Sequence, residues 1–89
     1  MTDPVPHADA ATVVLYTREG CHLCEAALPV VEAVCAEAGA SWTAVDVDTD
    51  PVLQRAFTDQ VPVTFVGGRQ HDFWRVDPQR LRAALARLG

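Results

Sequence analysis

The sequence of 89 residues predicts an α/β fold, with one four-stranded mixed sheet flanked by helices. Two features support this class. Short β-branched runs alternate with segments of helical periodicity, and a Gly-Gly pair separates the last two strand candidates. The predicted order of elements is β-α-β-α-β-β-α. Residues 1–11 contain two prolines and small polar residues, so we expect a flexible leader before a domain at residues 12–89.

The first half of the domain is predicted to form a strand, a helix and a second strand. Residues 12–16 are almost wholly apolar, which is typical of a strand buried on both faces. Pro29 within the following helix predicts a local bend or the loss of one hydrogen bond, and Gly39 predicts the end of the helix. Residues 42–47 form the second strand candidate, and the helical connection favours a right-handed βαβ unit. The apolar face of the helix comprises Leu23, Ala27, Val30, Val31, Val34, Cys35 and Ala38.

The second half is predicted to contain a short helix, a hairpin and a last helix. Asp50 and Pro51 are residue types that favour a helix cap and first turn. Residues 63–66 are a strand candidate, and the two glycines that follow tolerate the positive φ of a tight turn into an edge strand at residues 69–73. Asp77 is expected to cap the last helix. The apolar positions are Val52, Leu53, Ala56 and Phe57 in the short helix, and Leu81, Ala84, Leu85 and Leu88 in the last one.

Charge and composition argue against several functional classes. The formal net charge is -5, from 12 acidic residues and 7 basic residues that are all arginine, so nucleic acids and anionic membranes are unfavourable partners. The first residues lack a basic region followed by an apolar run, and no apolar stretch approaches membrane-spanning length. We therefore expect a cytoplasmic monomer, in which the three cysteines are redox, metal or core residues rather than structural disulfides.

The sequence Cys21-His22-Leu23-Cys24, at the predicted start of the first helix, is the motif most directly related to chemistry. The free N–H groups and partial positive charge of a helix N-terminus favour a thiolate, so we expect a depressed pKa and a nucleophilic sulfur at Cys21. Cys24 lies one turn later and can attack a mixed disulfide formed at Cys21, which releases the reduced partner. Such a pair exchanges two electrons with no cofactor bound in the site.

These residues also have alternative roles. A C-x-x-C pair can be half of a zinc site, but the remaining cysteine and the three histidines lack the spacing of zinc ligands, so no metal site is predicted. Cys35 lies on the apolar helix face and is expected to pack as a small hydrophobic residue. His22 could lower the pKa of Cys21 as an imidazolium, or could simply be solvated on the first helical turn.

Val61-Pro62, just before the third strand, is the second candidate element. A proline at the start of a strand cannot donate a hydrogen bond to the sheet. A cis bond here would leave the Val61 N–H and C=O available to an extended peptide partner. Cis X–Pro bonds are a minority in folded proteins, so the dipeptide alone does not predict the cis form.

With these motifs in this order, the sequence resembles the thioredoxin-like superfamily and, within it, the small bacterial glutaredoxin-like proteins of the DUF836 type. The resemblance extends over nearly the whole chain. It implies that Pro62 is cis and packs against the dithiol, that Cys21 is the attacking cysteine and that Cys24 resolves the intermediate. It also implies that Arg18 binds substrate or glutathione together with Val61 and Pro62.

Departures from the glutaredoxin pattern bear on the reductant. Gln60 stands where threonine is usual, and residues 73–77 replace a second Gly-Gly turn with side chains that could fill the space of the glutathione γ-glutamyl group. Asp77 lies near the position of the family's aspartate. Trp74 is similar to a tryptophan of the redoxins that accept electrons from thioredoxin reductase, or else covers the end of the last strand pair. The resemblance thus implies either glutathione or a thioredoxin-reductase-type donor.

Together, the motif and the resemblance predict a dithiol thiol–disulfide oxidoreductase. Its expected partners are disulfide-containing proteins, small-molecule disulfides or glutathione mixed disulfides. One alternative is a redox-inactive or regulatory partner-binding module, suggested by the missing Gly-Gly turn and by an exposed-looking Trp74. Another is a dimer that binds metal or an iron–sulfur cluster through Cys21.

Overall fold

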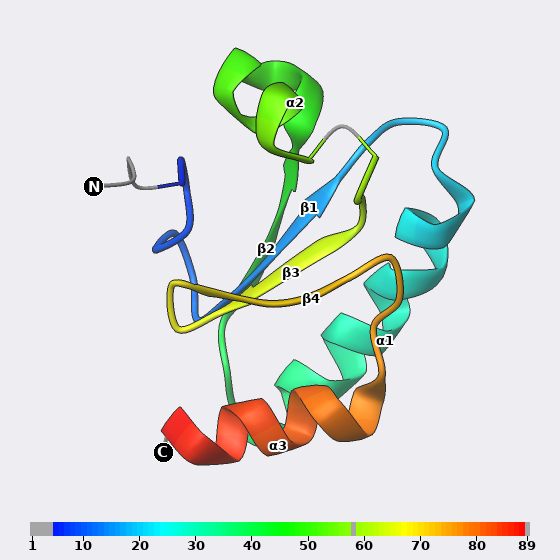
Figure 1. The fold of residues 1–89 in the computed structure, drawn as a ribbon. Helices are drawn as coiled ribbons and strands as arrows, with labels where there is room; N and C mark the ends of the chain where they lie inside the picture. Colours follow the sequence, from blue (N-terminus) through cyan, green and yellow to red (C-terminus); the bar gives the residue numbers. More distant parts are fainter. Residues whose placement is uncertain (1–4, 58, 89) are drawn as a thin grey trace.

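A computed structural model describes residues 5–57 and 59–88 and has the predicted order of elements (Figure 1). The elements are β1 (Val13–Thr17), α1 (His22–Ala38), β2 (Trp42–Asp46), the 3-10 turn η1 (Val47–Thr49), α2 (Pro51–Phe57), β3 (Val63–Val66), β4 (Arg69–Phe73) and α3 (Pro78–Leu88). The strands follow the order β2-β1-β3-β4, in which β1 is parallel to β2 and the other two pairs are antiparallel. The mixed four-stranded α/β sheet is therefore confirmed, and η1 is the element that the sequence analysis missed.

The strand register brings three distant segments to the same end of the sheet. Tyr16 near the end of β1 pairs with Val63 at the start of β3, and Val63 also pairs with Phe73 at the end of β4. The loop after β1, the segment before β3 and the chain that leaves β4 therefore lie at this end (Figure 1). The first leads to Cys21 and the second ends at Pro62.

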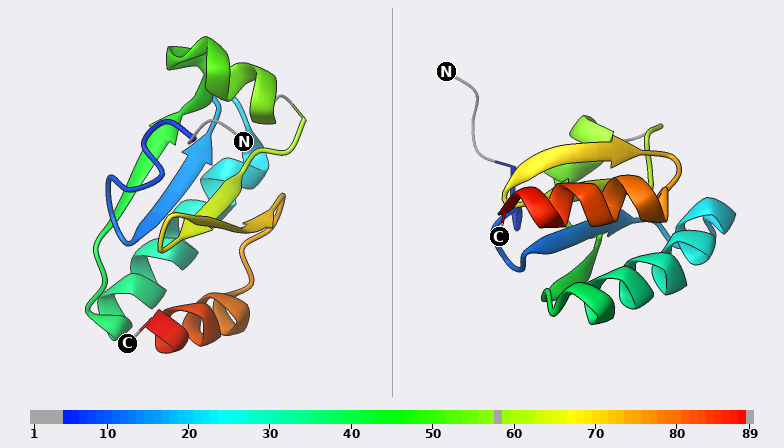
Figure 2. Two further views of the ribbon diagram at one scale, coloured as in Figure 1. Left: turned by 60° about the vertical axis from the view of Figure 1, so that its left-hand side comes forward. Right: turned by 90° about the horizontal axis from the view of Figure 1, so that it is seen from below.

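Helices cover both faces of the sheet, and two apolar clusters form the core (Figure 2). On one face α1 and α3 pack against the sheet, with the buried residues Val13, Leu15, Ala27, Val31, Val34, Cys35, Val66, Leu81 and Leu85. On the other face α2, η1 and the N-terminal segment contribute to a cluster of Ala8, Val14, Tyr16, Val47, Leu53, Phe57, Val63 and Phe65. Residues 13–16 have no exposed surface, which confirms a strand buried on both faces. No helix in the two described ranges is long and apolar enough to cross a membrane.

Helix α1 differs from the prediction in which residues it buries. The helix runs without interruption through Pro29 and ends at Gly39, whose φ of 66° confirms the predicted stop. Leu23 and Ala38, assigned to the apolar face from spacing, are exposed. The buried stripe begins at Cys24 instead, so Leu23 lies at its flank and projects towards solvent.

Local sequence signals determine the other turns as predicted. Gly67 and Gly68 have φ values of 60° and 80°. Positive φ at both central residues is typical of the tight two-residue turn that joins two antiparallel strands. The Asp50 carboxylate accepts the Val52 N–H at 2.8 Å at the start of α2. In the same way, the Asp77 carboxylate accepts the N–H of Gln79 at 2.8 Å at the start of α3.

The described part of the predicted leader packs on the domain. Ala8 is buried in the cluster on the α2 face, with neighbouring apolar residues of the segment packed against that cluster. The Tyr16 hydroxyl donates a hydrogen bond to the Pro6 carbonyl at 2.7 Å. A Cβ at Gly68 would lie 2.7 Å from the Asp9 carboxylate, so the segment also approaches the β3–β4 turn. Residues 1–4 of the predicted leader lie outside the described residues.

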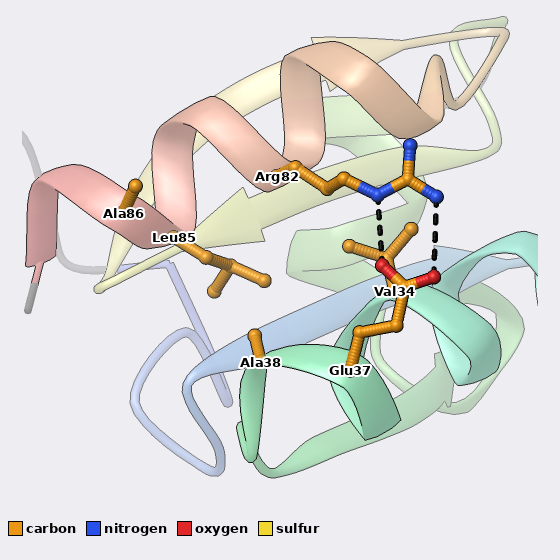
Figure 3. A pocket seen from close by; sticks show the side chains of 6 residues that line it. All are labelled: Val34, Glu37, Ala38, Arg82, Leu85 and Ala86. Atoms are coloured by element: carbon orange, nitrogen blue, oxygen red, sulfur yellow. Dashed lines mark hydrogen bonds and ion pairs between the residues drawn. The ribbon is translucent and has the colours of Figure 1, made fainter.

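A hollow of about 420 Å³ lies between α1 and α3 (Figure 3). Arg82 Nε donates to Glu37 Oε2 at 2.8 Å, and Arg82 Nη2 donates to Glu37 Oε1 at 3.3 Å. Both side chains are about half exposed, so solvent and salt weaken this pair. Glu37 is near the C-terminal end of α1, roughly 24 Å along the helix axis from Cys21. The hollow is therefore remote from the two closely spaced cysteines.

We predict that Tyr16→Phe lowers the free energy of unfolding by about 1 kcal/mol near neutral pH, because it removes the hydrogen bond to Pro6. Burial, and secondarily the charge of Asp9, raise the pKa of Tyr16 to about 12. A raised pKa means that the folded state favours the neutral phenol. Wild-type stability should therefore decline as the pH rises from about 10, the ordinary tyrosine pKa, towards 12.

Urea denaturation of both proteins near neutral pH and in this alkaline range measures the two effects. The buried thiols of Cys24 and Cys35 also have raised pKa values and contribute a decline of the same sign in both proteins. The decline should therefore be smaller in Tyr16→Phe than in the wild type. An equal decline in the two proteins would contradict the assignment to Tyr16.

Candidate functional site

Cys21 is the N-cap of α1, as the position of the C-x-x-C motif predicts. Its backbone is extended, with φ of -90° and ψ of 112°, and its sulfur accepts the Cys24 N–H at 3.2 Å. Its carbonyl accepts the Glu25 N–H at 3.1 Å and so begins the helical ladder. The Cys21 thiol is partly exposed. The residue is thus partly accessible from solvent, and its sulfur lies at a helix start, where negative charge is favoured.

Cys24 differs from Cys21 in its surroundings. Only 3% of its surface is exposed, although it lies one helical turn away on the same helix. Burial, followed by the hydrogen bond and charge of Cys21, raises the pKa of the Cys24 thiol to about 12. At neutral pH Cys24 is therefore a protonated thiol behind a more accessible one.

Cys35 is a third thiol with a different environment. It is fully buried in the cluster between α1 and α3, and burial raises the pKa of its thiol. All three cysteines are free thiols in this structure. The burial of Cys35 confirms the packing role expected from the apolar face of the helix.

Arg18 and His22 lie on either side of Cys21 in the sequence and have different contacts. The Arg18 guanidinium is 3.3 Å from the Asp48 carboxylate, a partner in η1 that the sequence analysis did not identify. The side chain of His22 is 98% exposed, with Nδ1 3.9 Å from a carboxylate oxygen of Glu25. The structure therefore places His22 in the solvated position that was one of its two expected locations.

The Val61–Pro62 peptide bond is cis, as the resemblance implies. Pro62 is buried and Val61 is partly exposed. Because of the strand register, this dipeptide lies at the end of the sheet to which the Cys21 loop belongs. Packing of Pro62 against the dithiol stays a prediction.

Trp74 lies just beyond β4 and reaches across to the segment before Pro62. Its indole Nε1 donates to the Asp59 carbonyl at 2.8 Å, and its ring meets that of Phe73 edge to face at 5.0 Å between centroids. Trp74 is nevertheless 52% exposed. This contact joins two segments distant in sequence, which is why residue type and strand periodicity alone did not predict it.

Exposed apolar side chains accompany the dithiol helix and the end of β4. Leu23, between the two cysteines, is 45% exposed, and Phe73 and Trp74 are similarly exposed. A hollow of about 290 Å³ beside the first turns of α1 is lined by Leu23, Ala26, Ala27, Val30, Arg75 and Val76. Helical spacing alone places Leu23 on the apolar face of α1, so this hollow was not predicted from the sequence. In residues 5–57 and 59–88, no three Cys, His, Asp or Glu side chains are grouped as metal ligands.

Comparisons with known proteins agree with this architecture. The model of the family described as glutaredoxin-like domain (DUF836) matches residues 12–86. Uncharacterised proteins of Mycobacterium tuberculosis and Mycobacterium bovis are 38% identical over 80 residues, which cover 84% of this chain and 82% of each relative.

Solved structures give the same fold. A structural-genomics target protein from X. campestris is 35% identical, with a TM-score of 0.63 over 84% of this chain and 96% of its own. A protein of Nitrosomonas europaea is 25% identical, with a TM-score of 0.70 over 93% of each chain. The holo form of glutaredoxin C1 from Populus tremula x tremuloides is 25% identical, with a TM-score of 0.61 over 92% of this chain and 90% of its own.

We predict that iodoacetamide modifies the three thiols of the reduced protein in a fixed order. Cys21 should react first because it is accessible. With a pKa of about 12, Cys24 has a thiolate fraction of only about one in ten thousand near pH 8. Peptide mass spectrometry after short exposure should find a single adduct on Cys21. Cys35, buried on the same helix, is the internal control. Modification of Cys24 as fast as that of Cys21 would contradict the predicted difference in reactivity between these two thiols.

Proposed function

Since the chain belongs to the glutaredoxin-like family known as DUF836, we propose that it is a dithiol oxidoreductase that reduces disulfides of proteins or small molecules. One observation supports this most strongly, the inequality of two thiols one helical turn apart. Cys21 is partly exposed at a helix start, whereas Cys24 is buried and protonated at neutral pH. A dithiol that reduces disulfides needs one thiol that attacks the substrate and a second thiol nearby that resolves the mixed disulfide.

In the first step the Cys21 thiolate attacks one sulfur of the substrate disulfide. A new S–S bond forms, the substrate S–S bond breaks, and the leaving thiolate takes up a proton from solvent. In the second step Cys24 gives up its proton and attacks the Cys21 sulfur, which releases the second substrate thiol. The substrate has gained two electrons, and Cys21 and Cys24 are joined in a disulfide.

The raised pKa of Cys24 suits this order of events. Burial is the largest cause of the rise in pKa, and the hydrogen bond and charge of the Cys21 sulfur add to it. Once Cys21 is bound in a mixed disulfide, its charge is gone and the Cys24 thiolate forms more easily. Cys24 is thus a weak competitor in the first step and an available nucleophile in the second.

We further propose that the donor that re-reduces the disulfide is a thioredoxin-reductase-type protein rather than glutathione, in the cytoplasmic setting expected from the sequence. Arg18, the cation expected to meet a glutathione carboxylate, has the Asp48 carboxylate 3.3 Å away. Bulky residues at positions 74–76 follow β4 in place of a glycine turn. Both features disfavour a small tripeptide that presents two carboxylates.

We predict that substitution of the three cysteines separates their roles. In single turnover of pre-reduced protein with a small disulfide, Cys21→Ser should fall to the uncatalysed rate because the attacking sulfur is absent. Cys24→Ser should accumulate a mixed disulfide at Cys21, seen as added mass, because nothing resolves it. Cys35→Ala, on the same helix, is the matched control and should react at the wild-type rate. A Cys21→Ser variant as fast as wild type would overturn the proposal and leave the binding-module alternative.

A second prediction concerns the donor. Turnover with thioredoxin reductase and NADPH should exceed turnover with glutathione and glutathione reductase by at least about tenfold, which corresponds to a free-energy difference of about 1.4 kcal/mol. Asp48→Asn removes the negative charge beside Arg18, so it should raise the rate with glutathione and leave the rate with thioredoxin reductase unchanged. Faster wild-type turnover with glutathione would contradict the proposed donor.

A further inference from the structure

Trp74 has a backbone conformation that ordinarily favours glycine. Its φ is 67°, and the Arg75 N–H donates to the Phe73 carbonyl at 2.9 Å across it. A positive φ with a hydrogen bond from residue i+2 to residue i is characteristic of the rare, strained form of the γ-turn. A bulky residue is seldom found there, and such strain is concentrated at functional positions. Its presence calls for a role of the indole that glycine could not fill.

The hydrogen bonds of Trp74 suggest that role. Its backbone N–H points to two carbonyls, that of Pro62 at 2.8 Å and that of Gln60 at 3.3 Å. Its indole N–H donates to a third carbonyl, that of Asp59, at 2.8 Å. One residue thus binds three of the four carbonyls between positions 59 and 62, and the carbonyl that it leaves out belongs to Val61.

Val61 is the exception within this segment. Among the described residues, neither its N–H nor its carbonyl takes part in a hydrogen bond, and the residue as a whole is partly exposed. A backbone donor and acceptor on the same partly exposed residue can pair with an extended chain, as an added strand does at a sheet edge. The segment lies at the same end of the sheet as the dithiol loop.

We propose that Trp74 is a positioning residue, which holds the Asp59–Pro62 segment so that the backbone of Val61 is presented to an extended polypeptide carrying the target disulfide. The inference rests on the proposed function and narrows its substrate class to polypeptide disulfides. The indole is suited to this task because its edge is fixed by Asp59 and by the ring of Phe73. Fixing the segment before binding removes an ordering cost that the partner would otherwise have to overcome.

Two variants of Trp74 and one control test this inference. Trp74→Phe keeps the aromatic ring but loses the indole N–H. Trp74→Gly removes the whole side chain, and glycine is unstrained at positive φ. It therefore provides a second variant if the Trp74→Phe protein folds poorly. Trp42→Phe makes the same change in β2, at the opposite edge of the sheet. Pre-reduced protein is mixed with either a short peptide containing one intramolecular disulfide or hydroxyethyl disulfide, which has no peptide backbone.

For the peptide, both Trp74 variants should raise the half-saturating concentration about fivefold, the factor equivalent to one hydrogen bond of about 1 kcal/mol, with the maximal single-turnover rate unchanged. The rate with hydroxyethyl disulfide should not change in any variant, and Trp42→Phe should match wild type with both substrates. Unchanged peptide saturation, or an equal loss with both substrates, would overturn the positioning role. If neither substrate oxidises the reduced wild-type protein, the proposed function itself is refuted, and the inference with it.

Discussion

The dithiol depends on one short contact, the hydrogen bond from the Cys24 N–H to the Cys21 sulfur at 3.2 Å. This contact fixes Cys21 as the cap of α1 and turns its sulfur towards the free N–H groups of the first turn. It also sets the spacing at which one cysteine is partly exposed and the next on the helix is buried. The two cysteines keep these positions only if α1 stays packed on the sheet, and the burial of Val31 and Val34 against the sheet stabilises that packing.

The remainder of the site depends on the sheet rather than on the helix. The pairing of Tyr16 with Val63 and of Val63 with Phe73 aligns the ends of three strands. β3 is buried on both faces, so a shift of one residue in either pairing would exchange the side chains that pack in the two apolar clusters and disrupt both. The cis Val61–Pro62 segment and the end of β4 are thereby brought to the end of the sheet that carries the dithiol loop.

Features governed by neighbours in sequence were predictable, and those governed by distant contacts were not. The caps at Asp50 and Asp77, the Gly67–Gly68 turn and the helix start at Cys21 follow from residue type and local hydrogen bonding. The ion pair of Arg18 with Asp48 and the reach of Trp74 to the Asp59 carbonyl join residues far apart in sequence. Leu23 was misplaced for a related reason: a spacing of three or four identifies a stripe but not its centre.

The proposed function requires that Cys21 and Cys24 form one two-electron redox pair and that Cys35 takes no part. A redox titration of the wild-type protein, read by mass spectrometry of peptides after the free thiols are blocked, tests this most directly. We expect one transition, with a tenfold change in the oxidised-to-reduced ratio for about 30 mV, and a Cys21–Cys24 disulfide as the only product. A disulfide that includes Cys35, or no internal disulfide at any potential, would contradict it.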